Sequence, residues 1–148
     1  MMRNAVLASV AFAAVLGLSV SASLGGPIED RQAAMKANGQ TMKLLGAMAQ
    51  GEAPFDAAVV KEQAEAMAAR YEAEKAMFPP GSDKGPPETY AKAEIWTDPA
   101  GFAAGMNEAI EASLALAAVT DQAKLGDALG AVGTVCKSCH EKYTRPRD

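Results

Sequence analysis

The sequence contains little of the chemistry on which many protein functions depend. Of its 148 residues only one is a histidine and two are cysteines, and aromatic residues make up 5%. Lys and Arg number 14 against 18 Asp and Glu, and no basic cluster occurs. Binding to nucleic acid depends on a surface that neutralises phosphates, so we expect no nucleic-acid partner.

Long apolar runs are also missing, with one exception at the start of the chain. Residues 5–20 are uncharged and apolar, Arg3 precedes them, and three small residues follow at positions 21–23. This order is typical of a secretory signal peptide. A membrane anchor is the alternative, but about sixteen apolar residues fall short of the ~20 that span a bilayer. We expect a cleaved signal peptide over residues 1–23 and a periplasmic domain over residues 24–148, without stable membrane insertion.

Alternating patterns of Val, Ile, Thr and Tyr, which would indicate strands, are absent, whereas Ala, Leu, Met, Glu and Lys are abundant. This composition favours helices. Apolar residues recur at helical spacing in four segments, which are residues 27–51, 54–78, 98–117 and 120–143. The pattern predicts four amphipathic helices.

The connections between these segments indicate how the helices are arranged. Two connections are short, whereas residues 78–98 contain four of the eight prolines and therefore form a long connection. Only residues 89–96 are expected to form a short helical turn within it. Two short connections and one long one predict an all-α fold, an antiparallel up-down-up-down four-helix bundle in a single domain.

The two cysteines and the histidine stand together near the end of the chain, in the motif Cys136-Lys137-Ser138-Cys139-His140. This is the spacing of c-type haem attachment. Two thiols one helical turn apart both reach the vinyl edge of one porphyrin, and the next imidazole turns toward the iron. Positions 136, 139 and 140 share the apolar face of the last predicted helix. We therefore predict one covalent haem c on Cys136 and Cys139, with His140 as axial ligand.

Three other interpretations of the motif are less consistent with the sequence. A thiol-disulfide redox pair works best at the start of a helix, where the dipole stabilises the thiolate, and this pair lies near a helix end. A closed zinc site needs four ligands, and the two cysteines and only histidine give three. A structural disulfide across a two-residue gap within a helix is disfavoured.

A single histidine excludes bis-histidine ligation within one chain. The remaining protein candidates for the sixth iron ligand are a lysine amine or one of the methionines of the mature chain. The third alternative is that no protein group occupies this position. Those methionines are Met35, Met42, Met48, Met67, Met77 and Met106.

The chain resembles the class II c-type cytochromes, a family that includes cytochrome c' and low-spin, methionine-ligated relatives. The resemblance rests on the haem motif close to the end of the chain, on residues 31–36 (RQAAMK) and on residues 94–99 (EIWTDP). It implies a four-helix bundle with haem between the first and last helices. It also places Met35 over the distal face of the haem.

The resemblance suggests further haem contacts. Arg31 and Gln32 match positions near a haem propionate, and Thr89 and Lys92 are additional candidates. A solvated surface position is the alternative for each of these four residues. In cytochrome c' an arginine usually follows the aromatic residue three places after the histidine, whereas here that place is a threonine, so the role of that arginine is not carried over.

The resemblance leads to two functional hypotheses. In the first, His140 and Met35 both ligate a low-spin iron, and the protein is a non-enzymatic electron carrier that serves redox partner proteins. Residues 35–39 (MKANG) favour this hypothesis because they look more like the low-spin relatives. In the second, Met35 only packs, and a five-coordinate, high-spin iron binds nitric oxide or carbon monoxide. A homodimer through the first two helices is expected in either case.

Overall fold

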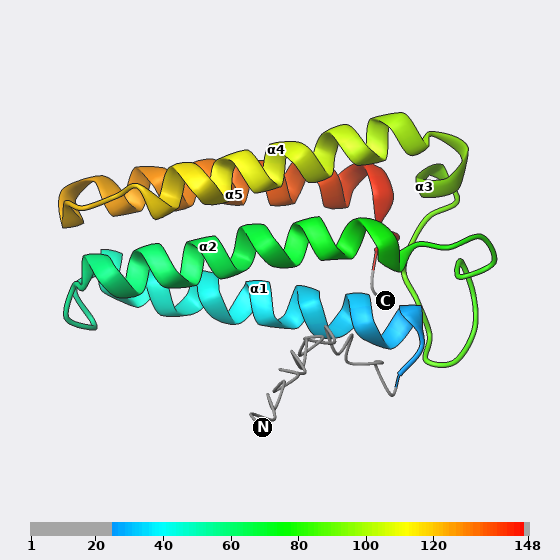
Figure 1. The fold of residues 1–148 in the computed structure, drawn as a ribbon, viewed down its shortest axis with the longest axis horizontal. Helices are drawn as coiled ribbons and strands as arrows, with labels where there is room; N and C mark the ends of the chain where they lie inside the picture. Colours follow the sequence, from blue (N-terminus) through cyan, green and yellow to red (C-terminus); the bar gives the residue numbers. More distant parts are fainter. Residues whose placement is uncertain (1–24, 147–148) are drawn as a thin grey trace, which may run out of the picture.

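Four long helices run side by side (Figure 1). The computed structural model describes residues 25–146, so the predicted signal peptide lies outside the described residues. A single turn of 3-10 helix, η1, extends the second long helix, and a short helix, α3, precedes the third. The helices are α1 (Pro27–Ala49), α2 (Ala57–Glu74), η1 (Lys75–Met77), α3 (Glu94–Thr97), α4 (Pro99–Ala117) and α5 (Gln122–Tyr143).

Aspartate side chains fix the starts of three of these helices. Asp56 accepts hydrogen bonds from the backbone N–H of Ala58 at 2.8 Å, so α2 begins at Ala57 rather than at residue 54. Asp98 caps α4 through the N–H of Gly101 at 3.0 Å, with a proline at the first helical position. Asp121 caps α5 in the same way. Each cap satisfies a backbone donor that the helix itself leaves unpaired.

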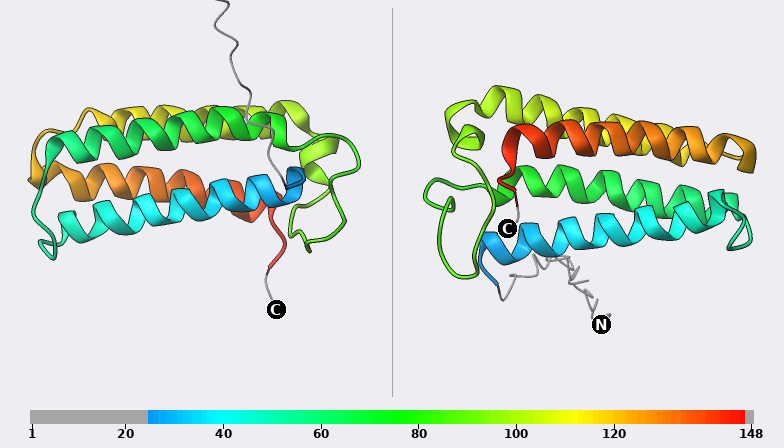
Figure 2. Two further views of the ribbon diagram at one scale, coloured as in Figure 1. Left: turned by 60° about the horizontal axis from the view of Figure 1, so that its bottom comes forward. Right: turned by 180° about the vertical axis from the view of Figure 1, so that it is seen from behind.

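The helices alternate in direction, and each packs against two neighbours. α1 packs against α2 and α5, and α4 packs against α2 and α5. Figure 2 shows this arrangement from two further sides, with the long connection of residues 78–93 at one end of the bundle. The predicted antiparallel four-helix bundle is confirmed.

The core lies along the axis between the four helices. Leu45 of α1, Met67 of α2, Leu116 of α4 and Leu125 of α5 are fully buried there. Burying each such side chain stabilises the fold by about 1.5–3 kcal/mol. The apolar stripes therefore face inward as predicted, except where a cavity opens among the four long helices.

The connection between α2 and α4 differs from its prediction. The expected turn over residues 89–96 starts only at Glu94, because the residues before it pair with the end of the chain. The N–H of Lys92 donates to the Tyr143 carbonyl at 2.9 Å, and the N–H of Arg145 donates to the Tyr90 carbonyl at 2.7 Å. Backbone groups used in this pairing cannot also form helical hydrogen bonds.

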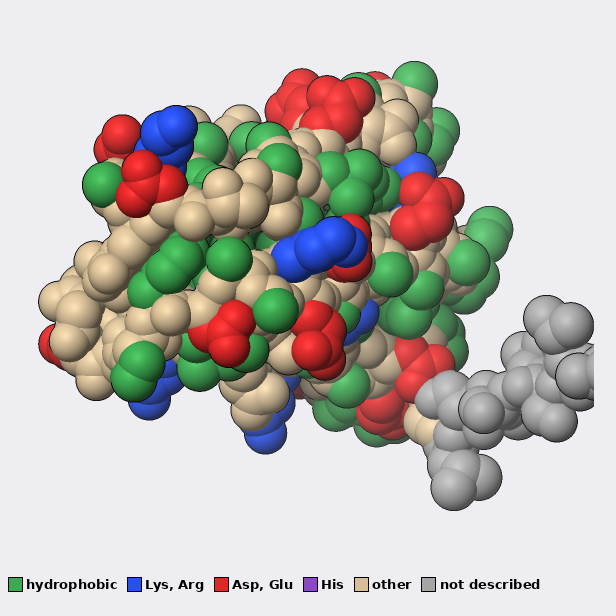
Figure 3. All heavy atoms as spheres, turned by 60° about the vertical axis from the view of Figure 1, so that its left-hand side comes forward, with side chains coloured by type: hydrophobic (Ala, Val, Ile, Leu, Met, Phe, Trp, Pro, Cys, Tyr) green, Lys and Arg blue, Asp and Glu red, His purple; other side chains and the backbone are tan. Residues whose placement is uncertain are grey.

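The surface of residues 25–146 is mixed in character. Figure 3 shows acidic and basic side chains interspersed with apolar ones at the end of the bundle opposite the long connection, without a continuous basic patch on that face. Among the described helices, none is long and apolar enough to span a membrane.

Candidate functional site

A cavity of about 240 Å³ opens among all four long helices. Its wall consists of apolar side chains, two glycines from the interior of helices, and the two cysteines and the histidine of the Cys-x-x-Cys-His motif. The lining residues are Met35, Asn38, Gly39, Met42, Tyr71, Met106, Ala109, Gly133, Val135, Cys136, Cys139 and His140. The structure thus brings together the predicted attachment residues, the predicted axial ligand and the candidate sixth ligand.

Helix α5 presents the two cysteines and the histidine to this cavity. Cys136 and Cys139 are half-buried and are not joined by a disulfide, and His140 is exposed. The two cysteines are separated by about 4.5 Å along the helix axis, which is close to one turn. The hydroxyl of Tyr71 on α2 lies 3.6 Å from the Cys136 sulfur.

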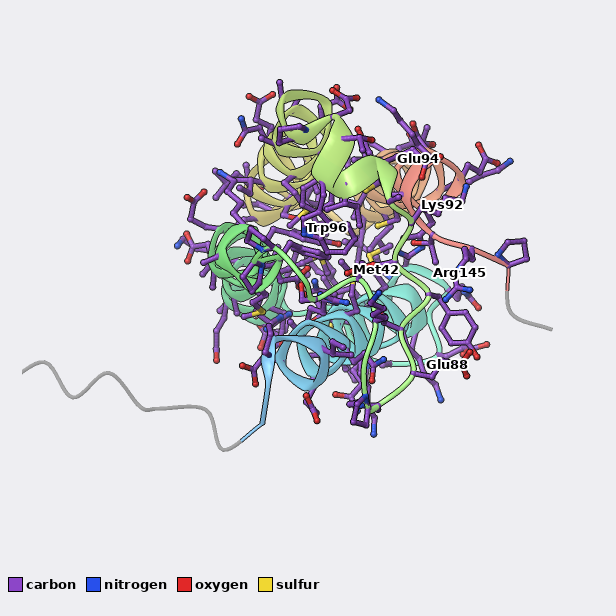
Figure 4. The ribbon with its side chains drawn as sticks, turned by 90° about the vertical axis from the view of Figure 1, so that its right-hand side faces the viewer. Met42, Glu88, Lys92, Glu94, Trp96 and Arg145 are labelled. Atoms are coloured by element: carbon purple, nitrogen blue, oxygen red, sulfur yellow. The ribbon has the colours of Figure 1, made fainter. Side chains whose placement is uncertain are left out.

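Helix α1 forms the opposite side of the cavity with two methionines. Met35 and Met42 are half-buried, whereas the neighbouring Leu45 is fully buried in the core. Figure 4, a view along the bundle, shows Met42 pointing toward the middle of the molecule. The two methionines are about 10.5 Å apart along the helix, so only one of them can reach a given iron.

The cavity residues fit an iron porphyrin. Gly39 of α1 and Gly133 of α5 line the cavity, and a Cβ placed on either would meet nothing within 4 Å. Glycine inside a helix destabilises it by roughly 1 kcal/mol relative to alanine. Two glycines at this wall are explained if the space beside them is needed for a flat group. Thiols for attachment, an imidazole for iron and an apolar wall are the chemistry that haem c needs.

The environment of Cys139 argues against thiol exchange. Burial raises the pKa of its thiol, and the negative charges of Cys136, Glu74 and Glu108 act in the same direction. A reactive cysteine requires the opposite shift, because the thiolate is the nucleophile. No group of three or more His, Cys, Asp or Glu side chains in the described range could hold a metal ion by itself, which gives no support to a zinc site.

Four further residues were predicted to contact the haem, and all four lie away from this cavity, near the long connection. They are Arg31, Gln32, Thr89 and Lys92. Gln32 donates to the Glu88 carbonyl at 2.7 Å, and Lys92 donates through its Nζ to the Glu141 carbonyl at 2.8 Å. Figure 4 shows Glu88 and Lys92 at this end of the bundle. Their role as haem contacts stays a prediction, since none of the four residues lines the cavity.

Arg31 is buried and binds the long connection. Its guanidinium donates to the Ser82 hydroxyl at 3.0 Å, to the Ser82 carbonyl at 2.6 Å and to the Thr89 hydroxyl at 2.8 Å. It also lies 4.9 Å from the centre of the Phe78 ring. Thr89 in turn accepts from Arg145 through its carbonyl at 2.6 Å. Arg145 is therefore tied to this connection.

The aromatic residues available to line a haem site include Phe55, Tyr71, Phe78 and Trp96. Of these, Tyr71 lines the cavity, whereas Phe55 does not. Phe78 and Trp96 pack against each other at 6.2 Å between ring centres, and the Trp96 indole N–H donates to the Phe78 carbonyl. These two rings belong to the packing around Arg31 and not to the cavity.

Sequence reasoning missed a polar network behind the cavity. Asn38 of α1 donates through Nδ2 to Glu74 Oε1 at 3.1 Å and accepts from Arg70 Nε at 2.7 Å. A further hydrogen bond runs from Arg70 to the Thr41 hydroxyl at 2.9 Å. The available signal was a polar residue on each apolar stripe, Asn38 three residues after Met35 and Glu74 three residues after Tyr71.

Comparison with known proteins agrees with this geometry. A family model described as Cytochrome C' matches residues 26–144. The chain belongs to the cytochrome c' family. It is 40% identical to a cytochrome c' of Pararhodospirillum photometricum over 119 residues, which cover 78% of this chain and 94% of the relative.

Solved structures of cytochromes c' share the fold. Cytochrome c' from Rhodopseudomonas palustris is 33% identical, with a TM-score of 0.76, and the match covers 84% of this chain and 99% of that one. A second cytochrome c', described as having an unusual ligand-controlled dimer dissociation, is 32% identical with a TM-score of 0.73, covering 84% and 100%. The chain is thus a monohaem c-type cytochrome that carries one covalent haem c.

Proposed function

We propose that this cytochrome is a high-spin haem protein that binds a small neutral gas, nitric oxide or carbon monoxide, at the iron position opposite His140. The observation that carries the proposal is the apolar wall of the cavity. Its polar side chains other than His140 are Asn38 and Tyr71, and both already have partners. A wall without free donors or cations suits a neutral diatomic ligand, because an anion would lose its hydration there without compensation.

Each motif residue has a defined task in this proposal. Cys136 and Cys139 hold the haem through thioether bonds, and His140 supplies the axial nitrogen, leaving the second axial position to an external ligand. Met35 covers that position as an apolar packing residue, so a ligand must displace it to bind. The haem supplies the iron chemistry, and the chain excludes water from it.

An absorption spectrum of the exported holoprotein tests this function. We expect a broad high-spin spectrum of the oxidised form, and a shift of the main band when carbon monoxide is added to the reduced form. A low-spin spectrum that carbon monoxide leaves unchanged would contradict the proposal.

The second candidate is an electron carrier whose iron is ligated by His140 and Met35. It is favoured by one observation, that Met35 lines the same cavity as His140 and is only half-buried. A thioether on the iron would hold its geometry nearly constant during electron transfer. The same spectrum separates the two candidates, because a ligated Met35 leaves no position for carbon monoxide.

We also propose a homodimer through α1 and α2. Leu44 on α1 is a large apolar side chain with 40% of its surface exposed. Gly46 on the same helix has only the end of Gln50 beside it, which permits close approach of a second backbone. Analytical ultracentrifugation of the native protein and of a Leu44→Glu variant is expected to show a dimer and a monomer, respectively. A native monomer would refute the dimer.

The proposed location is the periplasm. It is supported by the signal-like residues 1–23 and by the oxidising, haem-attaching compartment that a Cys-x-x-Cys-His motif requires.

A further inference from the structure

Glu74 is the one carboxylic acid among the buried residues of the described chain. Its side chain has no exposed surface, and within residues 25–146 it accepts one side-chain hydrogen bond, from Asn38 Nδ2 to Oε1. Oε2 is buried without a partner. No ion pair to Glu74 occurs within residues 25–146, since the nearby Arg70 donates to Asn38 and Thr41 instead. A buried carboxylate with a single neutral partner is poorly stabilised in its charged form.

This carboxyl is connected to the cavity by two routes. Asn38, which donates to it, is itself a cavity residue, and its amide orientation is fixed because Arg70 can only donate to its oxygen. Tyr71 stands one turn before Glu74 on α2, lines the cavity and contacts the Cys136 sulfur. A charge on Glu74 therefore changes the electrostatic potential where the haem is attached, because the protein interior screens it weakly.

We infer that Glu74 takes up a proton when the haem iron is reduced, so that this cytochrome couples electron uptake to proton uptake. One electron arrives at the iron from a one-electron donor, and one proton from water arrives at Glu74 Oε2. A single O–H bond forms and the net charge around the cavity is unchanged. The inference rests on the haem attachment proposed above, but not on the identity of the sixth ligand.

The charged and titratable groups around Glu74 are consistent with this role. On its own helix these are Arg70 and Tyr71, and α1 presents the neutral Asn38. Glu108 of α4 acts on Cys139, and α5 presents Cys136 and Cys139, which no longer titrate once they are thioethers. Burial raises the pKa of Glu74 from 4.5 to about 7, and the Asn38 hydrogen bond and the Arg70 charge only partly oppose this shift. A carboxyl in this range changes protonation state in response to a modest change of nearby charge.

The test is the pH dependence of the midpoint potential of the native holoprotein, of Glu74→Gln and of Glu72→Gln. Glu72 is a matched control, because it is an exposed acid on the same helix that pairs with Lys75. Between pH 6 and 8 we expect the native potential to fall with pH by up to about 59 mV per unit, a tenfold change in a one-electron equilibrium. Glu72→Gln keeps this slope and Glu74→Gln loses most of it.

An infrared difference spectrum of reduced minus oxidised protein provides a readout that does not depend on the potential. We expect a carbonyl band of a protonated acid that grows on reduction, shifts in heavy water, persists in Glu72→Gln and is absent in Glu74→Gln. A slope and a band that survive in Glu74→Gln would assign the proton to another group, such as a haem propionate, and overturn the inference. A native potential independent of pH would overturn it as well. Carbon monoxide is absent from these measurements, so their outcome is separate from that of the proposed gas binding.

Discussion

At the scale of single residues, Met35 is where the two candidate functions differ. It shares the cavity with His140, and its thioether either ligates the iron or only covers it. A packing role requires that its removal opens space without changing the coordination of the oxidised iron. A ligating role requires that its removal changes the spin state.

Met35→Ala is therefore expected to leave the oxidised spectrum high-spin and to increase carbon monoxide affinity about tenfold, which corresponds to relief of roughly 1.4 kcal/mol of steric cost. Met42→Ala is the control, because Met42 lines the same cavity two turns further along α1. Equilibrium titration with carbon monoxide measures the affinities. Conversion from a low-spin to a high-spin spectrum in Met35→Ala would instead identify Met35 as the sixth ligand.

Glu74 also predicts a pH dependence of stability. Its folded pKa of about 7 lies above its ordinary value of 4.5, so the folded chain binds the proton more tightly than the unfolded chain. The associated stability is fully present below pH 4.5 and is lost as the pH rises through 7, by on the order of 3 kcal/mol. Glu74→Gln, with no proton to lose, is expected to lack this decline.

Denaturant unfolding of the oxidised holoprotein at several pH values from 4.5 to 8 measures this effect. The quantity that matters is the difference in unfolding free energy between Glu74→Gln and the native protein, which should grow with pH. A difference that stays constant over this range would mean that Glu74 keeps an ordinary pKa in the folded chain.

At the scale of elements, the long connection depends on Arg31. This side chain joins α1 to Ser82 and Thr89, and it is buried among them. Arg31→Ala leaves several of these acceptors without a partner, so we expect a loss of about 3 kcal/mol of unfolding free energy and faster proteolysis within residues 78–93.

Gln32→Ala is the matched control, since Gln32 is an exposed neighbour with one hydrogen bond to the same connection. Its loss should cost no more than about 1 kcal/mol. If Arg31 serves mainly a haem propionate, the Arg31→Ala variant will show a changed reduction potential with almost unchanged unfolding.

The elements differ in how far the sequence predicts them. The starts of α4 and α5 follow from local chemistry, because Asp98 and Asp121 cap the helices that they precede. The conformation of residues 78–93 depends instead on contacts between residues more than 45 positions apart, such as Arg31 with Thr89 and Arg145 with Thr89. Neither propensity nor periodicity contains information on such contacts.

The residues of the candidate site also differ in how far the sequence predicts them. Cys136, Cys139 and His140 were predicted from their spacing, and Met35 from the family resemblance, and all four line one cavity. Asn38 and Glu74 were not predicted, because their importance comes from the crossing of α1 and α2, which brings the amide to the carboxyl. Polar residues on otherwise apolar stripes were the only sign of them.

At the scale of the whole molecule, the bundle is built around a space that its own side chains do not fill. The core is closed on either side of the cavity, whereas Met35 and Met42 and the two cysteines are only half-buried where α1 faces α5. Apolar groups left facing a cavity lose packing and hydrophobic stabilisation. A covalently held porphyrin would complete this part of the core, so haem attachment is a matter of folding as well as of function.

Mass spectrometry of the chain, produced in a host that attaches haem c and then denatured, tests this account most directly. The account predicts a mature chain heavier by one haem, with the haem retained on the peptide that contains Cys136 and Cys139. A chain of apoprotein mass, with both thiols free to react with an alkylating reagent, would contradict it.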